Sequence, residues 1–213
     1  MEITTAIYSK ITPTSIETPL LVLLHGWGSN ETDLPGLAQA LGLGLDFVSL
    51  RAPFSLSVGG FAWFLDPVVE RSKRDNQAKL SGDVILNWLE GEIAAGKIAK
   101  DRKLILLGFS QGGAMVSHLL TRSELAGKLA GVIMLSGYLP FDSDEVKSEN
   151  SDVPVFHGWG NLDTLVEPEE STRAAKWFKN NCQTIVDKNY PIEHSICLDE
   201  AQDIAGFVNS SVL

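Results

Sequence analysis

The sequence predicts an α/β fold with a mostly parallel central sheet, because short apolar runs alternate with longer amphipathic segments. Three apolar runs are continuous, as in strands buried on both faces, and span residues 20–24, 104–107 and 132–135. Other apolar residues recur at helical spacing: Val84, Ile85, Trp88, Leu89 and Ile93. At 213 residues and 44% hydrophobic, we expect one domain spanning residues 1–213, with helices on both faces of the sheet.

The remaining elements follow from the same patterns. Further strands are expected at residues 3–11, 46–50, 153–156 and 184–186, the first as an antiparallel edge. Further helices are expected at residues 35–41, from Ser110 to Leu120, around Trp177 and Phe178, and at 201–208. The long aromatic segment 51–66 is predicted to be a functional loop, and the acidic segment 140–152 a polar loop.

The net charge and the distribution of apolar residues limit the class of partner and the location of the protein. The formal charge is −10, from 17 basic and 27 acidic residues, which disfavours nucleic acid and anionic lipid surfaces. Residues 1–10 lack the apolar core of a secretory signal, and no apolar run is long enough to span a bilayer. We therefore expect a cytoplasmic protein without stable membrane insertion. Cys182 and Cys197 are too few for a disulfide framework. The sequence does not fix the oligomeric state, and a homodimer is one alternative.

The motif Gly108-x-Ser110-x-Gly112 lies between a predicted buried strand and a predicted helix. A serine hydroxyl becomes a useful nucleophile when a tight strand-to-helix turn presents it to a base, and small flanking residues make that turn possible. A phosphate-binding loop would need a following Gly-Lys-Ser/Thr, which is absent. The motif thus predicts a nucleophile elbow, with an ordinary turn serine as the alternative.

The base for this serine is sought among four histidines. His25 precedes the motif, His118 lies on the helix that leads away from it, and His157 ends a predicted strand as a structural histidine. His194 follows the last strand in a loop, where an imidazole can reach the elbow. The order serine, acid, histidine is that of α/β-hydrolases, so His194 is the predicted base.

The orienting acid should then follow a strand between Ser110 and His194. Asp163 comes in the predicted turn after residues 153–156 and is the candidate, because it would hold the imidazole in one tautomer. Asp152 precedes that strand and would lie at the wrong edge of the sheet. Asp142, Asp144 and Asp187 are expected to be surface carboxylates.

An acyl-transfer site also needs backbone N–H groups as an oxyanion hole. The amide of Gln111 directly follows the nucleophile and opens a helix, so it is the first candidate. The second is the amide of Trp27, in the segment His25-Gly26-Trp27-Gly28 that follows the strand at residues 20–24. An ordinary glycine-rich turn is the alternative reading of that segment.

These residues resemble the phospholipase/carboxylesterase family, which includes acyl-protein thioesterases and small bacterial carboxylesterases. The resembling segments are residues 24–30, 51–53, 63–64, 108–113, 157–168 and 190–195. The resemblance implies an α/β-hydrolase fold with about seven strands, no metal, no organic cofactor, and hydrolysis of esters or thioesters. Two positions depart from the family pattern: Glu193 stands where glycine usually precedes the histidine, and Leu65 interrupts the Trp-Phe-Asp stretch.

We therefore predict an esterase or thioesterase with Ser110, Asp163 and His194 as its triad and a small-molecule or acylated substrate. An apolar acyl groove is expected from Trp27, Phe61, Trp63 and Leu65, with plain core packing as the alternative. A rival from another class is a non-catalytic binding or receptor protein on the same scaffold, and a peptidase is a weaker rival.

Overall fold

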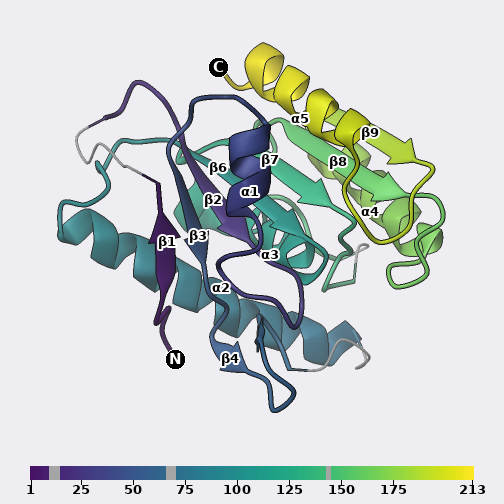
Figure 1. The fold of residues 1–213 in the computed structure, drawn as a ribbon, viewed down its shortest axis with the longest axis horizontal. Coiled ribbons are helices and arrows are strands. Elements are labelled where there is room, and N and C mark those ends of the chain that lie inside the picture. The colour runs from purple at the N-terminus through teal and green to yellow at the C-terminus, as the bar shows by residue number, and fades with distance from the viewer. Residues whose placement is uncertain (10–14, 66–70, 143–144) are drawn as a thin grey trace.

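The computed structural model describes residues 1–9, 15–65, 71–142 and 145–213. Seven strands form one sheet in the order β1-β3-β2-β6-β7-β8-β9 (Figure 1). Their bounds are β1 Ala6–Tyr8, β2 Leu20–Leu24, β3 Phe47–Leu50, β6 Leu104–Phe109, β7 Leu129–Leu135, β8 Val155–Gly160 and β9 Ile185–Tyr190. Strand β1 runs antiparallel to β3, and the other neighbouring strands are parallel. This confirms the predicted α/β class and the antiparallel edge.

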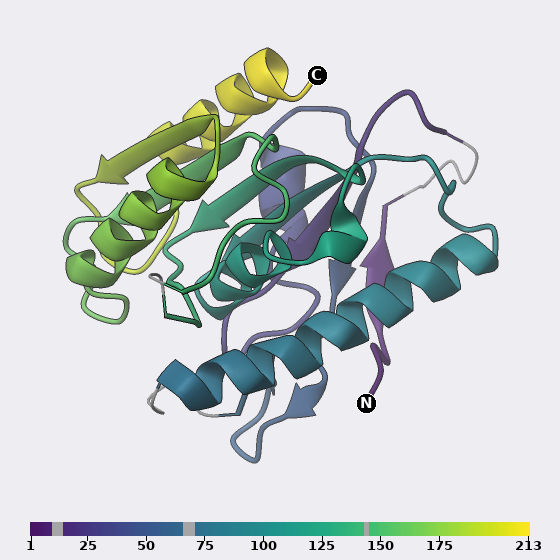
Figure 2. The same ribbon diagram turned by 180° about the vertical axis from the view of Figure 1, so that it is seen from behind.

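The helices cover both faces of the sheet. Their bounds are α1 Pro35–Ala40, α2 Arg71–Ala94, α3 Gln111–Leu119, α4 Pro168–Asn181 and α5 Leu198–Ser211, with a short 3-10 helix at Ser123–Leu125. Helices α1 and α5 lie on one face (Figure 1), and α2, α3 and α4 lie on the other (Figure 2). Each predicted helix is present.

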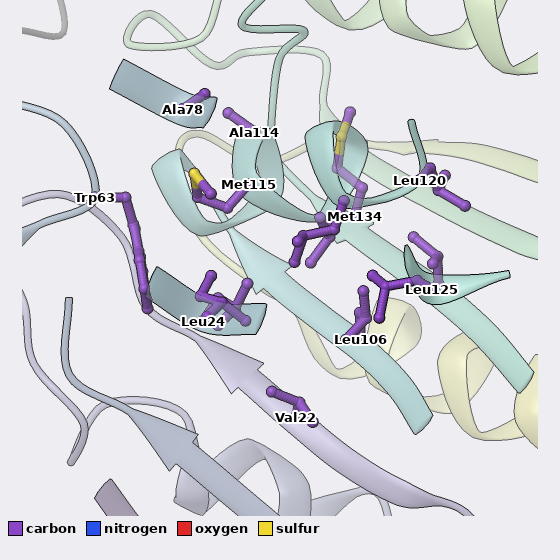
Figure 3. Close-up of a cluster of buried hydrophobic side chains, with 14 of the residues drawn as sticks. Val22, Leu24, Trp63, Ala78, Leu106, Ala114, Met115, Leu120, Leu125 and Met134 are labelled. Carbon is purple, nitrogen blue, oxygen red and sulfur yellow. The ribbon is translucent and has the colours of Figure 1, made fainter. Parts of the chain in front are cut away.

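The continuous apolar runs are explained by this double cover. In β2, Val22 and Leu24 belong to the core beneath α2 and α3, whereas Leu21 and Leu23 belong to the core beneath α1 and α5. Because successive side chains of a strand point to opposite faces, a strand covered on both sides needs apolar residues throughout. Figure 3 shows Val22 and Leu24 with Leu106 and Met115 in the first of these cores.

Strand β8 is longer than the sequence pattern suggested. The predicted strand ended at residue 156, and Gly158 to Asp163 was expected to form a turn, but β8 continues to Gly160. The residue at position 160 is glycine because another chain segment passes close to this strand position. A Cβ atom at this position would lie 2.3 Å from the carbonyl oxygen of Ile192. Glycine there reflects a close backbone approach rather than a turn.

The predicted functional loop at residues 51–66 contains a small hairpin. Strands β4 Phe54–Ser55 and β5 Phe61–Ala62 pair antiparallel, apart from the main sheet. Asp66 at the end of this segment, like Lys10 and Ile11 at the end of the predicted first strand, lies outside the described residues.

The carboxyl ends of the parallel strands share one edge of the sheet, where ligands of open α/β sheets bind. The segments that follow β2, β6, β8 and β9 carry Trp27, Ser110, Asp163 and His194, respectively. Cys182 and Cys197 are both free thiols. Over the ranges that the structure covers, no helix combines the length and apolarity of a membrane span.

Candidate active site

Ser110 sits on a strained turn between β6 and α3. Its backbone angles are φ 54° and ψ −116°, in the left-handed half of conformational space that residues other than glycine rarely adopt. Two backbone hydrogen bonds hold the turn: the Ser110 amide donates to the carbonyl of Leu135 at the end of β7 at 2.9 Å, and the Ala114 amide in α3 donates to the Ser110 carbonyl at 3.0 Å. The strand-to-helix turn that the motif predicted is therefore present, with the strain that such a turn imposes.

Gly112, two residues after Ser110, is required by close packing. A Cβ atom at Gly112 would lie 1.9 Å from the carbonyl oxygen of Leu24 and 2.7 Å from that of His25. Helix α3 therefore starts directly against the end of β2. This contact sets the elbow beside the segment that carries Trp27.

His194 and Asp163 form a hydrogen-bonded pair beside the elbow. Nδ1 of His194 lies 2.6 Å from Oδ2 of Asp163. The second carboxylate oxygen of Asp163, Oδ1, accepts the backbone amides of Leu165 at 2.8 Å and Val166 at 2.9 Å. The aspartate side chain is 1% exposed and that of His194 is 16% exposed, so the carboxylate is buried behind an imidazole that reaches the surface.

The two loops of this pair are joined to each other. The Asn161 amide donates to the carbonyl of Tyr190 at 2.9 Å, and the Leu162 amide donates to that of Ile192 at 3.1 Å. Glu193, which replaces a glycine of the family pattern, has no left-handed backbone angle. The loop therefore has its shape without glycine at that position.

Ser110 and His194 line the same cavity, whose volume is about 620 Å³. The ring of Phe109 lies 4.9 Å from that of His194, centre to centre, so His194 packs against the residue that precedes Ser110. The described hydrogen bonds do not include one between the Ser110 hydroxyl and His194. Such catalytic contacts often tighten when substrate binds.

Two unused backbone donors border this cavity. Trp27 and Gln111 both line it, and among the described residues neither backbone amide has a backbone acceptor. The N–H of Gln111 is also the first of α3, where the helix dipole favours negative charge. These are the two amides that the sequence nominated for an oxyanion hole.

Buried polar contacts hold the Trp27 segment in place. His25 is completely buried; Nδ1 lies 2.7 Å from the carbonyl oxygen of Gly26, and Nε2 accepts the amide of Ala52 at 3.1 Å. Burial lowers the pKa of His25, which keeps the ring neutral for these contacts. The Trp63 indole donates to the His25 carbonyl at 2.9 Å.

The Gln111 side chain braces the same region from the other side. Its Oε1 accepts the amide of Trp63 at 2.8 Å, and its Nε2 donates to the carbonyl of Phe64 at 2.8 Å. The side chain thus anchors the segment after β5, while the backbone amide stays available at the cavity.

The cavity includes only part of the predicted acyl groove. Trp27 lines the cavity, but Phe61, Trp63 and Leu65 do not. Trp63 is completely buried because its ring packs against His25 and its N–H is engaged there, and Leu65 points outward with 51% exposure. The lining residues that the predicted groove did not include are Phe109, Tyr138, Leu165 and Val166, among others. Phe109 lies within the elbow motif, and Leu165 and Val166 lie within the resembling segment 157–168, whereas Tyr138 had no sequence signal.

The other two histidines lie away from the cavity lining. His118 is buried on α3, with neither ring nitrogen hydrogen-bonded, and burial lowers its pKa to about 4. His157 is buried within β8; Nδ1 contacts Oδ1 of Asp187 at 2.9 Å, and Nε2 has no partner. His157 is therefore structural as predicted, but only half satisfied, and Asp187 is its partner rather than a purely solvated carboxylate. In the part of the chain with described positions, no cluster of three or more acidic, histidine or cysteine side chains could hold a metal ion.

The chain is similar to known proteins over nearly its whole length. A model of the phospholipase/carboxylesterase family matches residues 6–212. Acyl-protein thioesterase 1 of Saccharomyces cerevisiae is 28% identical over 216 residues, covering 90% of this chain and 92% of the yeast protein. Among solved structures, esterase PE8 has 25% identity and a TM-score of 0.78, covering 98% of both chains. The Bacillus cereus carboxylesterase shares the fold with 18% identity and a TM-score of 0.79, covering 97% of this chain and 93% of its own.

Proposed function

The chain belongs to the phospholipase/carboxylesterase family, and on that premise we propose that it cleaves acyl esters or thioesters through Ser110, His194 and Asp163. It is accordingly a hydrolase that acts on esters. One observation carries the assignment of residues: a serine held at φ 54° on a strand-to-helix turn shares a cavity with an imidazole that is paired with a buried carboxylate. Thioesters are included because the yeast relative is named a thioesterase.

In the first half of the reaction, His194 removes the hydroxyl proton of Ser110 as the serine oxygen attacks the acyl carbonyl. Asp163 keeps the proton of the ring on Nδ1, so that Nε2 is the basic nitrogen, and it stabilises the imidazolium that forms. The amides of Trp27 and Gln111 hydrogen-bond the oxyanion of the tetrahedral intermediate. The intermediate collapses to an acyl-serine, and the alcohol or thiol leaves with the proton from His194.

In the second half, water replaces the alcohol or thiol. His194 accepts a proton from water, whose oxygen attacks the acyl-serine carbonyl, and the same two amides stabilise the second oxyanion. Collapse releases the carboxylic acid and returns the proton to Ser110. The chain's own residues and one water molecule balance these steps.

Replacement of the nucleophile tests the proposal. Ser110→Ala is expected to lower kcat for 4-nitrophenyl butanoate by ~10⁴-fold or more, because the remaining donors bind substrate without a nucleophile. Ser210→Ala, in the remote helix α5, is the matched control and should retain wild-type turnover. Circular dichroism checks that both variants fold. Near-wild-type turnover by folded Ser110→Ala would refute the assignment, and no turnover by the wild type on any ester would favour the non-catalytic binder.

A further inference from the structure

Residues 25–31, the oxyanion segment, carry the Trp27 amide but do not fix its position by themselves. The segment contains Gly26 and Gly28, and Gly28 has a φ of 78°. Glycine leaves the backbone free to adopt many conformations. The Trp27 side chain is 44% exposed, so core packing does not fix the residue between the two glycines. An oxyanion donor acts best when it is held in place before the reaction, so contacts on either side must position this amide.

Contacts on both sides come from the chain that follows β3. On the amino side, the Ala52 amide donates to Nε2 of His25 at 3.1 Å. On the carboxyl side, Phe61 forms an antiparallel bridge with Ser29. The Phe61 amide donates to the Ser29 carbonyl at 2.8 Å, and the Gly28 amide donates to the Phe61 carbonyl at 2.9 Å. The proposed oxyanion amide therefore lies between two attachments, to residues 52 and 61.

Arg51 connects these two attachments. Its Nε donates to Oε2 of Glu31 at 2.6 Å and its Nη2 donates to Oε1 at 2.5 Å, so the guanidinium and the carboxylate meet at two points. The same guanidinium lies over the ring of Phe61, with its carbon 4.4 Å from the ring centre. Arg51 therefore joins the Glu31 end of the oxyanion segment to the hairpin that carries Phe61, one residue before the Ala52 attachment.

An ion pair of this kind contributes direction more than stability. The Glu31 side chain is 7% exposed and that of Arg51 is 28% exposed. The hydrogen bonds from the guanidinium lower the pKa of Glu31, which keeps the carboxylate charged. Removing two charges from water offsets much of their attraction, and apolar residues of similar volume are often equally stabilising. The planar fork of an arginine, in contrast, fixes both the distance and the orientation of its partner.

We propose that Arg51 is a positioning residue for ester hydrolysis: its guanidinium, held between Glu31 and the Phe61 ring, keeps the Trp27 amide directed at the oxyanion. The proposal rests on the proposed acyl transfer at Ser110. Arg51 does not line the cavity, so its effect passes through the oxyanion segment. Loss of the ion pair would leave the nucleophile and its base in place and would weaken one of the two oxyanion donors.

A double variant without the ion pair separates positioning from stability. Glu31→Leu/Arg51→Met replaces both charges with apolar side chains, so its unfolding temperature is expected to equal or exceed that of the wild type. With 4-nitrophenyl butanoate, kcat should fall about 10- to 100-fold, because complete loss of one oxyanion donor costs about 10²- to 10³-fold. KM should stay within about twofold, since both half-reactions use the same amides and slow together.

The carbonyl group of the acyl-enzyme reports on the oxyanion hole directly. Acylation of Ser110 by trans-cinnamoylimidazole forms an ester whose carbonyl stretching frequency is measured by rapid-mixing difference infrared spectroscopy. Hydrogen bonds from the two amides polarise this carbonyl and lower its frequency. The frequency should therefore be higher in the double variant than in the wild type, whereas a purely structural role of the ion pair would leave it unchanged.

Two further variants complete the test. Arg122→Met/Glu124→Leu is the matched control, because this pair also meets at two points, with distances of 3.3 and 2.6 Å, but lies beyond the end of α3 opposite Ser110. Its kcat and carbonyl frequency should equal those of the wild type. Arg51→Lys keeps the charge, but an ammonium group cannot form the two-point contact. It should change kcat and the frequency in the same directions as the double variant, and it decides the question if the double variant does not fold.

A folded Glu31→Leu/Arg51→Met variant with kcat within about twofold of the wild type, or a kcat loss with an unchanged carbonyl frequency, would overturn the inference. Either result leaves the ester-hydrolase proposal standing, because the wild type still forms the acyl-serine. Failure of the wild type to form an acyl-enzyme at Ser110 would count against the ester-hydrolase proposal itself.

Discussion

His157 and His194 each place Nδ1 against an aspartate, at 2.9 Å from Asp187 and 2.6 Å from Asp163. Their surroundings differ. His157 lies within β8, completely buried, with its ring 5.7 Å from that of Phe178 and its Nε2 without a partner. His194 lies in the loop after β9, borders the cavity and shares it with Ser110.

The difference teaches that a histidine–aspartate hydrogen bond does not define a catalytic site. Asp187 is shared with the Trp159 indole at 3.3 Å and with the Lys179 ammonium at 3.3 Å, so it serves a structural network. The second carboxylate oxygen of Asp163 accepts the amides of Leu165 and Val166, which fixes the orientation of the carboxylate toward one imidazole. Position at the carboxyl edge of the sheet, beside a strained serine, separates the two pairs.

The largest expected effect comes from removing the negative charge of each aspartate in turn. Asp163→Asn should lower kcat by ~10⁴-fold, because an amide favours the wrong tautomer of His194. Its Oδ1 can still accept the two loop amides, so the fold should survive. Asp187→Asn should keep kcat within about threefold while lowering the free energy of unfolding by about 1–3 kcal/mol, the cost of weakening a buried polar contact. Steady-state kinetics and urea unfolding on both variants check this; comparable kcat losses would erase the distinction.

The next largest effect, on the pH dependence of stability, is expected from Glu200, a buried residue whose carboxylate has no hydrogen-bond partner. It is completely buried in the first turn of α5, neither carboxylate oxygen is hydrogen-bonded, and burial raises its pKa from 4.5 to about 7. Between these values the folded protein keeps a proton that the unfolded chain releases, so stability falls as pH rises, by about 3 kcal/mol in total.

Glu200→Gln cannot ionise and should lack this loss. Its free energy of unfolding relative to the wild type should therefore increase by about 3 kcal/mol from pH 4.5 to pH 8, measured by denaturant unfolding. The opposite slope is expected from His118, whose stabilising contribution is lost as pH falls from its ordinary value of 6.5 towards about 4. Parallel pH curves for wild type and Glu200→Gln would show that the carboxyl is not buried in the way described.

A smaller effect should come from moving the backbone beside His194. A methyl group at Gly160 would lie 2.3 Å from the carbonyl oxygen of Ile192 and 2.7 Å from that of Glu193, so Gly160→Ala should displace the histidine loop. Displacement of about 1 Å can cost ~10²-fold in rate, and we expect a loss of about 10- to 100-fold in kcat. Gly206→Ala on α5, where nothing lies within 4 Å of the added methyl, is the control and should gain about 0.5–1 kcal/mol of stability. Equal kcat for both alanine variants would show that the loop tolerates the shift.

Local patterns predicted the sheet, the elbow and the positions of Ser110, Asp163 and His194, because each depends on which edge of the sheet a residue follows. Gly158 and Gly160 were misread as a turn, since a sequence does not show that another loop will pass against a strand. The cavity lining was less predictable still. The Trp63 indole donates to the His25 carbonyl in the interior, and Tyr138 lines the cavity two residues after Ser136, whose backbone is strained. Both outcomes depend on tertiary packing.

The rate at which a fluorophosphonate labels Ser110 tests the central claim most directly, because it reports the reactivity of the serine without any assumption about the substrate. Mass spectrometry of the labelled peptide should place the adduct on Ser110 in the wild type. Labelling should be as fast in Asp187→Asn and slower by ~10²-fold or more in Asp163→Asn, because only the second change disturbs the base of the serine. Labelling at another residue, or equal rates in all three proteins, would contradict the account.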